Sequence, residues 1–165
     1  TIQKASHRAL MDGATPRGIV DALASFDGDA PIVVMTYYNP VHHAGHDRFA
    51  GALASAGIAG AIIPDLPLDE LDGWGDAADS ADVETVLLVA PTTPDDRLDA
   101  ICKRSRGFVY GVSLLGVTGE RASLSERALD MGRRLKAATD MPALLGVGLM
   151  ACATLYRRRV GEILP

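Results

Sequence analysis

Short, continuously apolar runs alternate with helical patterns along this chain, and this alternation limits the possible folds more than any other feature. Strands that are apolar at every position are buried on both faces, which is typical of a parallel sheet covered by helices. The sequence therefore predicts an α/β protein with about five parallel strands, formed by the runs at 32–37, 59–63, 85–90, 107–113 and 141–145.

The segments between these runs carry the signals of helices. Thr15–Pro16 and Thr93–Pro94 each combine a capping hydroxyl with a first-turn proline, so each predicts the start of a helix. Residues 72–82 are interpreted as a polar stretch before the next strand. Another helix is predicted by an apolar stripe at steps of three and four, formed by Leu124, Ala128, Met131, Leu135 and Ala138.

Repeated βα units of this length occur in two architectures, the (β/α)₈ barrel and the open doubly wound sheet. The chain has 165 residues. A full barrel needs about 250 residues, whereas five strands suit a complete open sheet. Length alone therefore favours the doubly wound alternative.

Composition excludes several classes of partner. The net charge of -5 and the absence of a basic stripe argue against binding to nucleic acid or an anionic membrane. The longest apolar runs have the length of strands and no export signal opens the chain, so a cytoplasmic location is expected by default. Cys102 and Cys152 form neither a disulfide framework nor a zinc ligand set.

Two glycine-containing segments follow the last two apolar runs. Leu115–Gly119, which includes the hydroxyl of Thr118, follows the run at 107–113, and Gly146–Gly148 follows the run at 141–145. Glycines let backbone N–H groups approach an anion closely, and ligands collect at the carboxyl ends of strands. The two segments predict one shared phosphate site, although glycines that only form tight turns would give the same pattern.

Six motifs occur in order and in register: Thr1–Gln3 with Arg8–Leu10, Met35–Pro40, Pro64–Pro67, Leu88–Thr93, Ser113–Gly119 and Gly146–Gly148. Together they resemble the tryptophan synthase alpha subunit family. The resemblance implies that residues 1–148 form part of a (β/α)₈ TIM barrel, with about five of its eight strands. It also implies cleavage of indole-3-glycerol phosphate to indole and glyceraldehyde 3-phosphate.

The same resemblance implies partners and marks what this chain lacks. The indole would pass to a beta subunit that carries pyridoxal phosphate, in an alpha2beta2 heterotetramer. The family's catalytic glutamate and aspartate precede the segment that matches Thr1, so these 165 residues are expected to be inactive alone. Residues 149–165 are predicted to form a divergent tail without the family's last strand, the result of a frame error or a truncation near Gly148.

Carried over residue by residue, the resemblance assigns Thr118 a catalytic role beside the missing aspartate. The positions expected to bind substrate are Tyr37, Tyr110, Gly116, Gly119, Gly146 and Gly148. For both tyrosines, packing in the barrel core is an equal alternative. The positions expected to face the beta subunit are Asn39, Pro40 and Pro67, all of which are also ordinary turn residues.

Other reaction chemistries find little support. The three lysines fall in helical patterns, so no lysine ends a strand where a Schiff base would form. His42, His43 and His46 are predicted to share one solvated loop rather than a metal site, and no metal or cofactor is expected in this chain. Asp65 ends a strand, but a structural role in the turn at Pro64–Pro67 is expected.

Two alternatives to the enzymatic function remain open. One is a non-catalytic module that binds phosphate or touches the beta subunit. The other is a different phosphate-binding barrel of the same pathway, such as phosphoribosylanthranilate isomerase. The motifs at Tyr37–Pro40 and Gly116–Gly119 argue against that isomerase.

Overall fold

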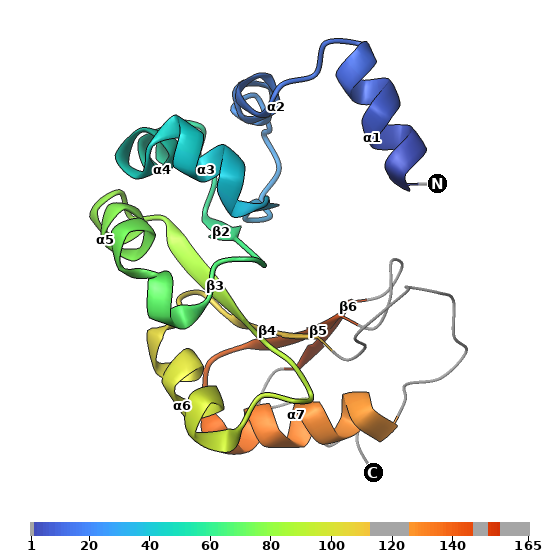
Figure 1. Ribbon diagram of the computed structural model, residues 1–165, viewed down its shortest axis with the longest axis vertical. Helices are drawn as coiled ribbons and strands as arrows, with labels where there is room; N and C mark the ends of the chain where they lie inside the picture. The colour runs from blue at the N-terminus through green and yellow to red at the C-terminus, as the bar shows by residue number, and fades with distance from the viewer. Residues whose placement is uncertain (1, 113–125, 147–151, 156–165) are drawn as a thin grey trace.

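A computed structural model of the chain describes residues 2–112, 126–146 and 152–155, and shows one curled sheet with helices on its outer side (Figure 1). The strands lie side by side in the order in which they occur along the chain. The first five are parallel and the sixth is antiparallel to the fifth. They are β1 Val33–Met35, β2 Gly60–Ile62, β3 Glu84–Val89, β4 Val109–Val112, β5 Ala143–Gly146 and β6 Cys152–Leu155.

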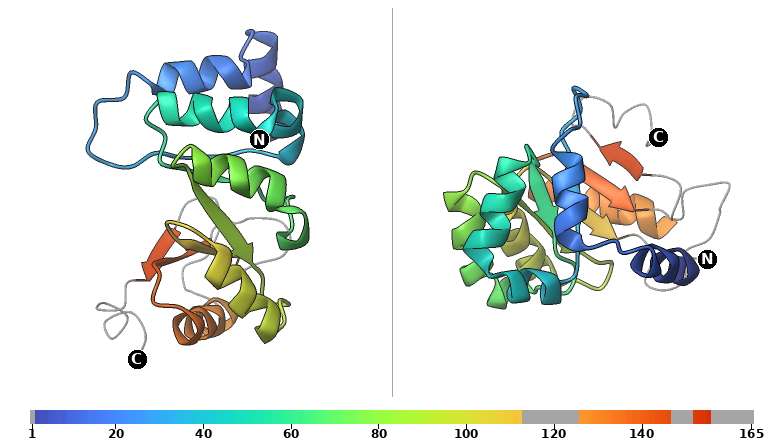
Figure 2. Two further views of the ribbon diagram at one scale, coloured as in Figure 1. Left: turned by 90° about the vertical axis from the view of Figure 1, so that its left-hand side faces the viewer. Right: turned by 90° about the horizontal axis from the view of Figure 1, so that it is seen from above.

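The helices follow one another around the outside of the sheet, as both views of Figure 2 show. They are α1 Ile2–Met11, α2 Pro16–Leu23, α3 Tyr38–Ala44, α4 His46–Ser55, the 3₁₀ helix η1 Leu68–Glu70, α5 Asp72–Ser80, α6 Asp95–Arg104 and α7 Glu126–Ala138. A doubly wound sheet would reverse its strand order at a switch point. Because each described strand adds to the same edge, the partial barrel is confirmed and the doubly wound alternative is wrong.

Alternate residues of the strands fill the core between sheet and helices. Val83, Leu87 and Val89 of the β3 region belong to one buried cluster, together with Val109 of β4 and Ala143 of β5. Side chains that alternate with these face the concave inner side. The outer face therefore carries the stability of the fold, and the inner face remains for a ligand.

The predicted helix signals are largely confirmed. Thr15 caps α2 by accepting a hydrogen bond from the Gly18 N–H at 3.0 Å. Ala128, Met131 and Leu135 of α7 are buried, as the stripe predicts, whereas Leu124 lies outside the described residues. The capping role of Thr93 is wrong, because its hydroxyl instead accepts the N–H of Ala90 at 2.9 Å.

Two elements differ from expectation. Residues 72–82 are not simply a polar stretch: α5 occupies most of them and buries Trp74, Ala77 and Ala78 against the sheet and α4. The tail beyond residue 148 contains a strand that the sequence did not indicate, β6, which pairs Cys152 with Gly146. Its antiparallel direction nevertheless distinguishes β6 from the parallel strand expected at that place in a barrel.

Within the described ranges, no helix combines the length and the apolarity that crossing a bilayer requires.

Candidate functional site

The carboxyl ends of the five parallel strands meet at one edge of the curled sheet. Three described loops leave the strands at this edge: Thr36–Tyr37 after β1, Ile63–Pro67 after β2 and Ala90–Pro94 after β3. In a curled parallel sheet, substrates bind at this edge. The geometry of these loops and of the concave face beside them therefore defines the candidate site.

A row of side chains in register crosses the concave face. Leu88 of β3, Tyr110 of β4 and Leu144 of β5 are neighbours in the sheet, and all three are half-buried. Tyr110 reaches along this face to the end of β5, where a Cβ placed on Gly146 would collide with its hydroxyl oxygen. The absence of a side chain at Gly146 thus makes room for the Tyr110 ring.

Tyr37 and Tyr110, both predicted to bind substrate, differ in their surroundings. Tyr37 ends the loop after β1 and begins α3, and 69% of its surface is exposed. Met35, the last residue of β1, is 56% exposed. Apolar surface at the carboxyl end of β1 is therefore exposed, whereas Tyr110 is packed over the end of β5.

Asp65 joins the first two loops. One of its carboxylate oxygens, Oδ1, accepts a hydrogen bond from the backbone N–H of Tyr38 at 2.8 Å. This N–H is one of the unsatisfied donors at the start of α3. Asp65 therefore holds the start of α3, whereas the role expected from sequence was to hold its own turn at Pro64–Pro67.

An ion pair also connects the segment after β2 with the helix after β3. Arg97 of α6 donates to Asp69 of η1 at 2.7 Å, and this bond raises the pKa of the Arg97 guanidinium. Both side chains are largely exposed, so the pair contributes little to stability. Its effect is geometric, since it connects the segment after β2 with the helix after β3.

The remaining predicted site residues divide into two groups. Thr118, Gly116, Gly119 and Gly148 lie outside the described residues. Asn39 and Pro67 are exposed and Pro40 is half-buried. Asn39 and Pro40 belong to the first turn of α3 rather than to a plain turn, because proline is tolerated in the first turn of a helix.

The three histidines do not share a loop. His42 and His43 lie in α3, and His46 begins α4 after Gly45. The His46 ring nitrogen Nε2 is 3.0 Å from the Tyr38 hydroxyl. Across the described part of the chain, no three side chains of the metal-binding types converge as a metal site would require.

Lysines and the described cysteine offer no reactive group at this edge. Lys4, Lys103 and Lys136 all lie in helices, as the sequence predicts. Cys102 of α6 is a buried free thiol, and burial raises its pKa. A protonated buried thiol is a weak nucleophile, so Cys102 is a core residue.

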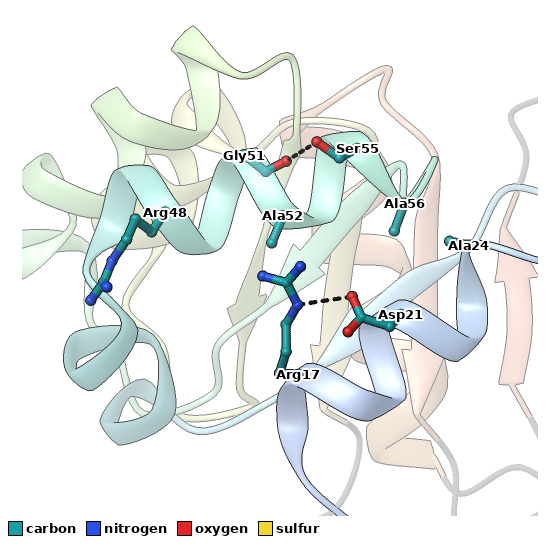
Figure 3. Close-up of a pocket in the computed structure, with 8 residues that line it drawn as sticks. All are labelled: Arg17, Asp21, Ala24, Arg48, Gly51, Ala52, Ser55 and Ala56. Carbon is teal, nitrogen blue, oxygen red and sulfur yellow. Dashed lines mark hydrogen bonds and ion pairs between the residues drawn. The ribbon is translucent and has the colours of Figure 1, made fainter.

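A cavity that sequence patterns did not indicate lies between α2 and α4 (Figure 3). Its volume is about 310 Å³, and small residues of α4 such as Gly51 and Ala52 line it. Arg17 and Asp21 at its rim form an ion pair of 2.8 Å. None of the predicted site residues lines this cavity, and its single carboxylate is already paired, so it offers no acid and base together.

Comparison with known proteins decides the family. The family model described as tryptophan synthase alpha chain matches residues 1–159. The chain belongs to the tryptophan synthase alpha chain family. This membership removes the isomerase alternative and confirms the resemblance found in the motifs.

Curated alpha chains show how far the similarity extends. The alpha chain of Picosynechococcus sp. is 44% identical over 151 residues, which cover 90% of this chain and 57% of the relative. That of Streptomyces avermitilis is 48% identical over 119 residues, which cover 72% of this chain and 43% of the relative. The chain thus spans about half the length of the curated alpha chains it matches.

Solved structures agree with the curled sheet. Mycobacterium tuberculosis tryptophan synthase superposes with a TM-score of 0.82 at 40% identity, covering 90% of this chain and 57% of that chain. A tryptophan synthase complex from Pyrococcus furiosus gives a TM-score of 0.82 at 33% identity, covering 99% of this chain and 64% of that chain. The described strands therefore have the arrangement of the corresponding part of an alpha-chain barrel.

Proposed function

We propose that this chain provides the substrate-holding part of a tryptophan synthase alpha chain. In this proposal, the concave face binds indole-3-glycerol phosphate for cleavage to indole and glyceraldehyde 3-phosphate. The observation that carries it is the half-buried Tyr110, which lies over Gly146 at the carboxyl edge of a sheet with the family's fold.

The geometry suits a ligand with an apolar end and an anionic end. Tyr37, Met35 and the row at Leu88–Tyr110–Leu144 supply apolar surface for an indole ring. We assign the phosphate to backbone N–H groups at Gly146–Gly148, with Gly116, Thr118 and Gly119 closing over the substrate, as the resemblance implies. Only Gly146 of these lies within the described residues.

Cleavage requires two proton transfers. An acid protonates the indole ring carbon, a base removes a proton from the glycerol hydroxyl group, and the carbon–carbon bond between them breaks. Asp65 is the described carboxylate that follows β2 directly, and it is engaged with the Tyr38 N–H. We assign the acid and the base to the family's glutamate and aspartate, so a polypeptide of only these 165 residues binds without turnover.

The proposal includes the partner and the compartment. Asn39 and Pro40 lie in the first turn of α3 and Pro67 lies on the loop after β2, and we assign this surface to a beta subunit that carries pyridoxal phosphate. The alpha chain itself uses no cofactor in this scheme. A biosynthetic reaction of this kind belongs in the cytoplasm.

The direct test combines binding with turnover. Glycerol 3-phosphate and indole-3-glycerol phosphate are titrated into the purified chain, and indole release is assayed with and without added beta subunit. We expect binding of both ligands and no indole. Indole release by the 165 residues would overturn the assignment of the acid and base, and failure of both ligands to bind would overturn the site.

A matched pair of glycine variants tests the location of the site. In Gly146→Ala the added methyl group displaces the Tyr110 ring, so ligand affinity should fall by about tenfold or more. In Gly51→Ala the methyl group meets no atom within 4 Å, so affinity should not change. Equal affinities for the two variants would contradict a site at the end of β5.

A non-catalytic role is the second candidate. It is favoured by the exposed loops after β1 and β2, which offer a binding surface whether or not a reaction takes place. A chain that binds the beta subunit but neither phosphate ligand would support this role instead.

A further inference from the structure

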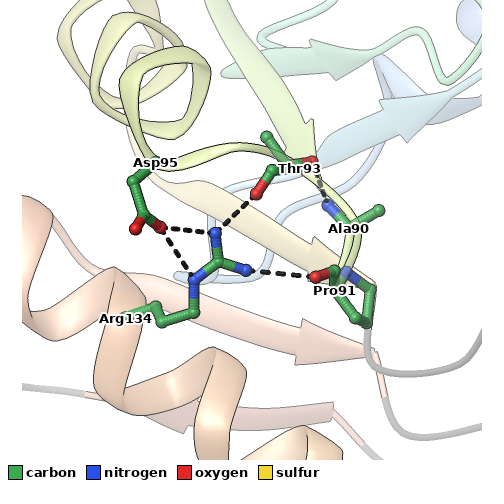
Figure 4. Close-up of polar contacts among 5 residues, drawn as sticks. All are labelled: Ala90, Pro91, Thr93, Asp95 and Arg134. Atoms are coloured by element: carbon green, nitrogen blue, oxygen red, sulfur yellow. Dashed lines mark hydrogen bonds and ion pairs between the residues drawn. The ribbon is translucent and has the colours of Figure 1, made fainter.

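One arginine, Arg134 of α7, binds the loop that follows β3 through several hydrogen bonds. Its guanidinium donates to the backbone oxygens of Pro91 and Thr93 and to the carboxylate of Asp95 (Figure 4). The bond to Pro91 measures 3.2 Å, and those to Asp95 measure 2.7 and 3.1 Å. A single side chain thus joins α7 to two positions of the loop after β3 and to the first residue of α6.

Hydrogen bonds within the loop fix its conformation but not its position relative to α7. The Thr93 N–H donates to the Ala90 oxygen at 2.9 Å, and the Ala90 N–H donates to the Thr93 hydroxyl at 2.9 Å. These reciprocal bonds close the turn internally. The oxygens of Pro91 and Thr93 point outward from it, and Arg134 binds both (Figure 4). Arg134 therefore fixes where the closed turn sits relative to α7.

Burial separates this contact from an ordinary surface ion pair. The Arg134 side chain is 23% exposed, whereas that of Asp95 is 88% exposed. An exposed carboxylate adds little to such a pair. A guanidinium presents several donors in one rigid plane, which suits two carbonyl oxygens and a carboxylate at once. The backbone contacts, and not the ion pair, are the specific part of the arrangement.

The place of this loop in the fold connects it to the site. Residues 90–94 leave the carboxyl end of β3, next to β4 with Tyr110, and α7 packs on β4 and β5. We infer that Arg134 is a positioning residue for the substrate site: it holds the loop at residues 90–94 at the distance from β4 that the ligand requires. This inference rests on the proposed function, since it assigns the ligand to that edge.

The test measures the dissociation constant for glycerol 3-phosphate in variants of the whole chain. Arg134→Met should raise it about tenfold, because small displacements of a binding loop have large effects. Arg134→Lys should lose most of the same affinity, since one ammonium group cannot replace the planar set of donors. Asp95→Asn, which keeps the backbone contacts, and Arg133→Met on the exposed neighbour should stay within about twofold of the unmodified chain.

The pattern across variants separates positioning from stability. Melting temperatures are measured in parallel, and every affinity is measured well below the melting transition, so a loss of stability alone would leave the affinity of Arg134→Met unchanged. Unchanged affinity in Arg134→Met, or equal losses in Arg134→Met and Asp95→Asn, would overturn the inference.

A second measurement distinguishes its failure from that of the proposed function. If the unmodified chain does not bind glycerol 3-phosphate, the proposed function fails, and amide hydrogen exchange at Ala90 and Thr93 then tests Arg134. Faster exchange at these amides in Arg134→Met, with no change in Arg133→Met, would support the anchoring of the loop. Exchange at the unmodified rate would overturn it.

Discussion

The middle of the sheet and the N-terminal segment place their large apolar side chains in opposite environments. In the middle, α5 and α6 pack on β3, α4 packs on α5, and residues such as Leu53 and Trp74 are completely buried. In the N-terminal segment, Met11 of α1 is 74% exposed and Phe26 after α2 is 52% exposed. Every α1 side chain whose exposure is described is exposed.

This difference indicates which part of the chain unfolds as a cooperative unit. Burial of a large apolar side chain contributes about 1.5–3 kcal/mol. The middle gains this at many positions, whereas Val20 is the one buried side chain among the described residues of the N-terminal segment up to Phe26. Clustered exposed apolar residues mark a surface meant for contact. We expect the middle to behave as the cooperative core and the N-terminal segment to unfold locally without it.

The largest expected effect is at Trp74. Trp74→Ala should reduce the free energy of unfolding by about 3–5 kcal/mol, because the ring is fully buried beside Phe49. Chemical denaturation followed by circular dichroism measures this. Phe26→Ala is the matched control. An equal loss of unfolding free energy in this variant would contradict the difference between the two regions.

A substitution at Ser105 tests how much buried hydrogen bonds stabilise the middle of the sheet. The buried hydroxyl accepts the Leu87 N–H at 3.0 Å and donates to the Phe108 oxygen at 2.7 Å. Ser105→Ala leaves both groups unsatisfied and should cost about 1–3 kcal/mol. Ser55→Ala removes an exposed hydroxyl bonded to Gly51 and should cost far less. Equal unfolding midpoints for the two variants would contradict this account.

Thr15 tests the N-terminal segment. Thr15→Ala removes the cap of α2, and a lost cap costs about 1 kcal/mol of helix stability. If this segment unfolds locally, amide exchange within α2 should accelerate while exchange in β3 stays the same. Thr15→Ser keeps the capping oxygen and should restore protection. A change in β3 protection would show that the two regions unfold together.

The smallest effect is expected at α1. Leu10→Ser and Met11→Ser should change the free energy of unfolding by less than about 0.5 kcal/mol, because both side chains are exposed. The same changes should improve solubility, since they remove exposed apolar area. Light scattering during a concentration series measures this. A large loss of stability would place α1 within the cooperative core.

Much of the fold follows from the sequence because local pattern and tertiary environment agree there. The five apolar runs contain the five parallel strands, with ends that shift by a few residues. Their order in the sheet does not follow from periodicity, and length alone favoured the wrong architecture. The family motifs decided it.

Two helices and several contacts were not predicted from the sequence, and each has a physical reason. The helix at 72–80 combines two glycines with three aspartates, which hide the apolar spacing of Trp74, Ala77 and Ala78. The helix at 38–44 contains Pro40, which read as a turn signal although it lies in a first turn. Long-range contacts such as Asp65 to Tyr38 and Arg134 to Pro91 join residues far apart in the chain, so no local pattern could indicate them.

Strand order that equals chain order has a consequence for how the molecule is made. Each strand pairs with the strand that precedes it, so every unit leaving the ribosome finds its neighbour already in place. Among the described strands, no pairing has to wait for a distant part of the polypeptide, which favours rapid formation. Mechanical pulling on the two ends should accordingly peel off one βα unit after another.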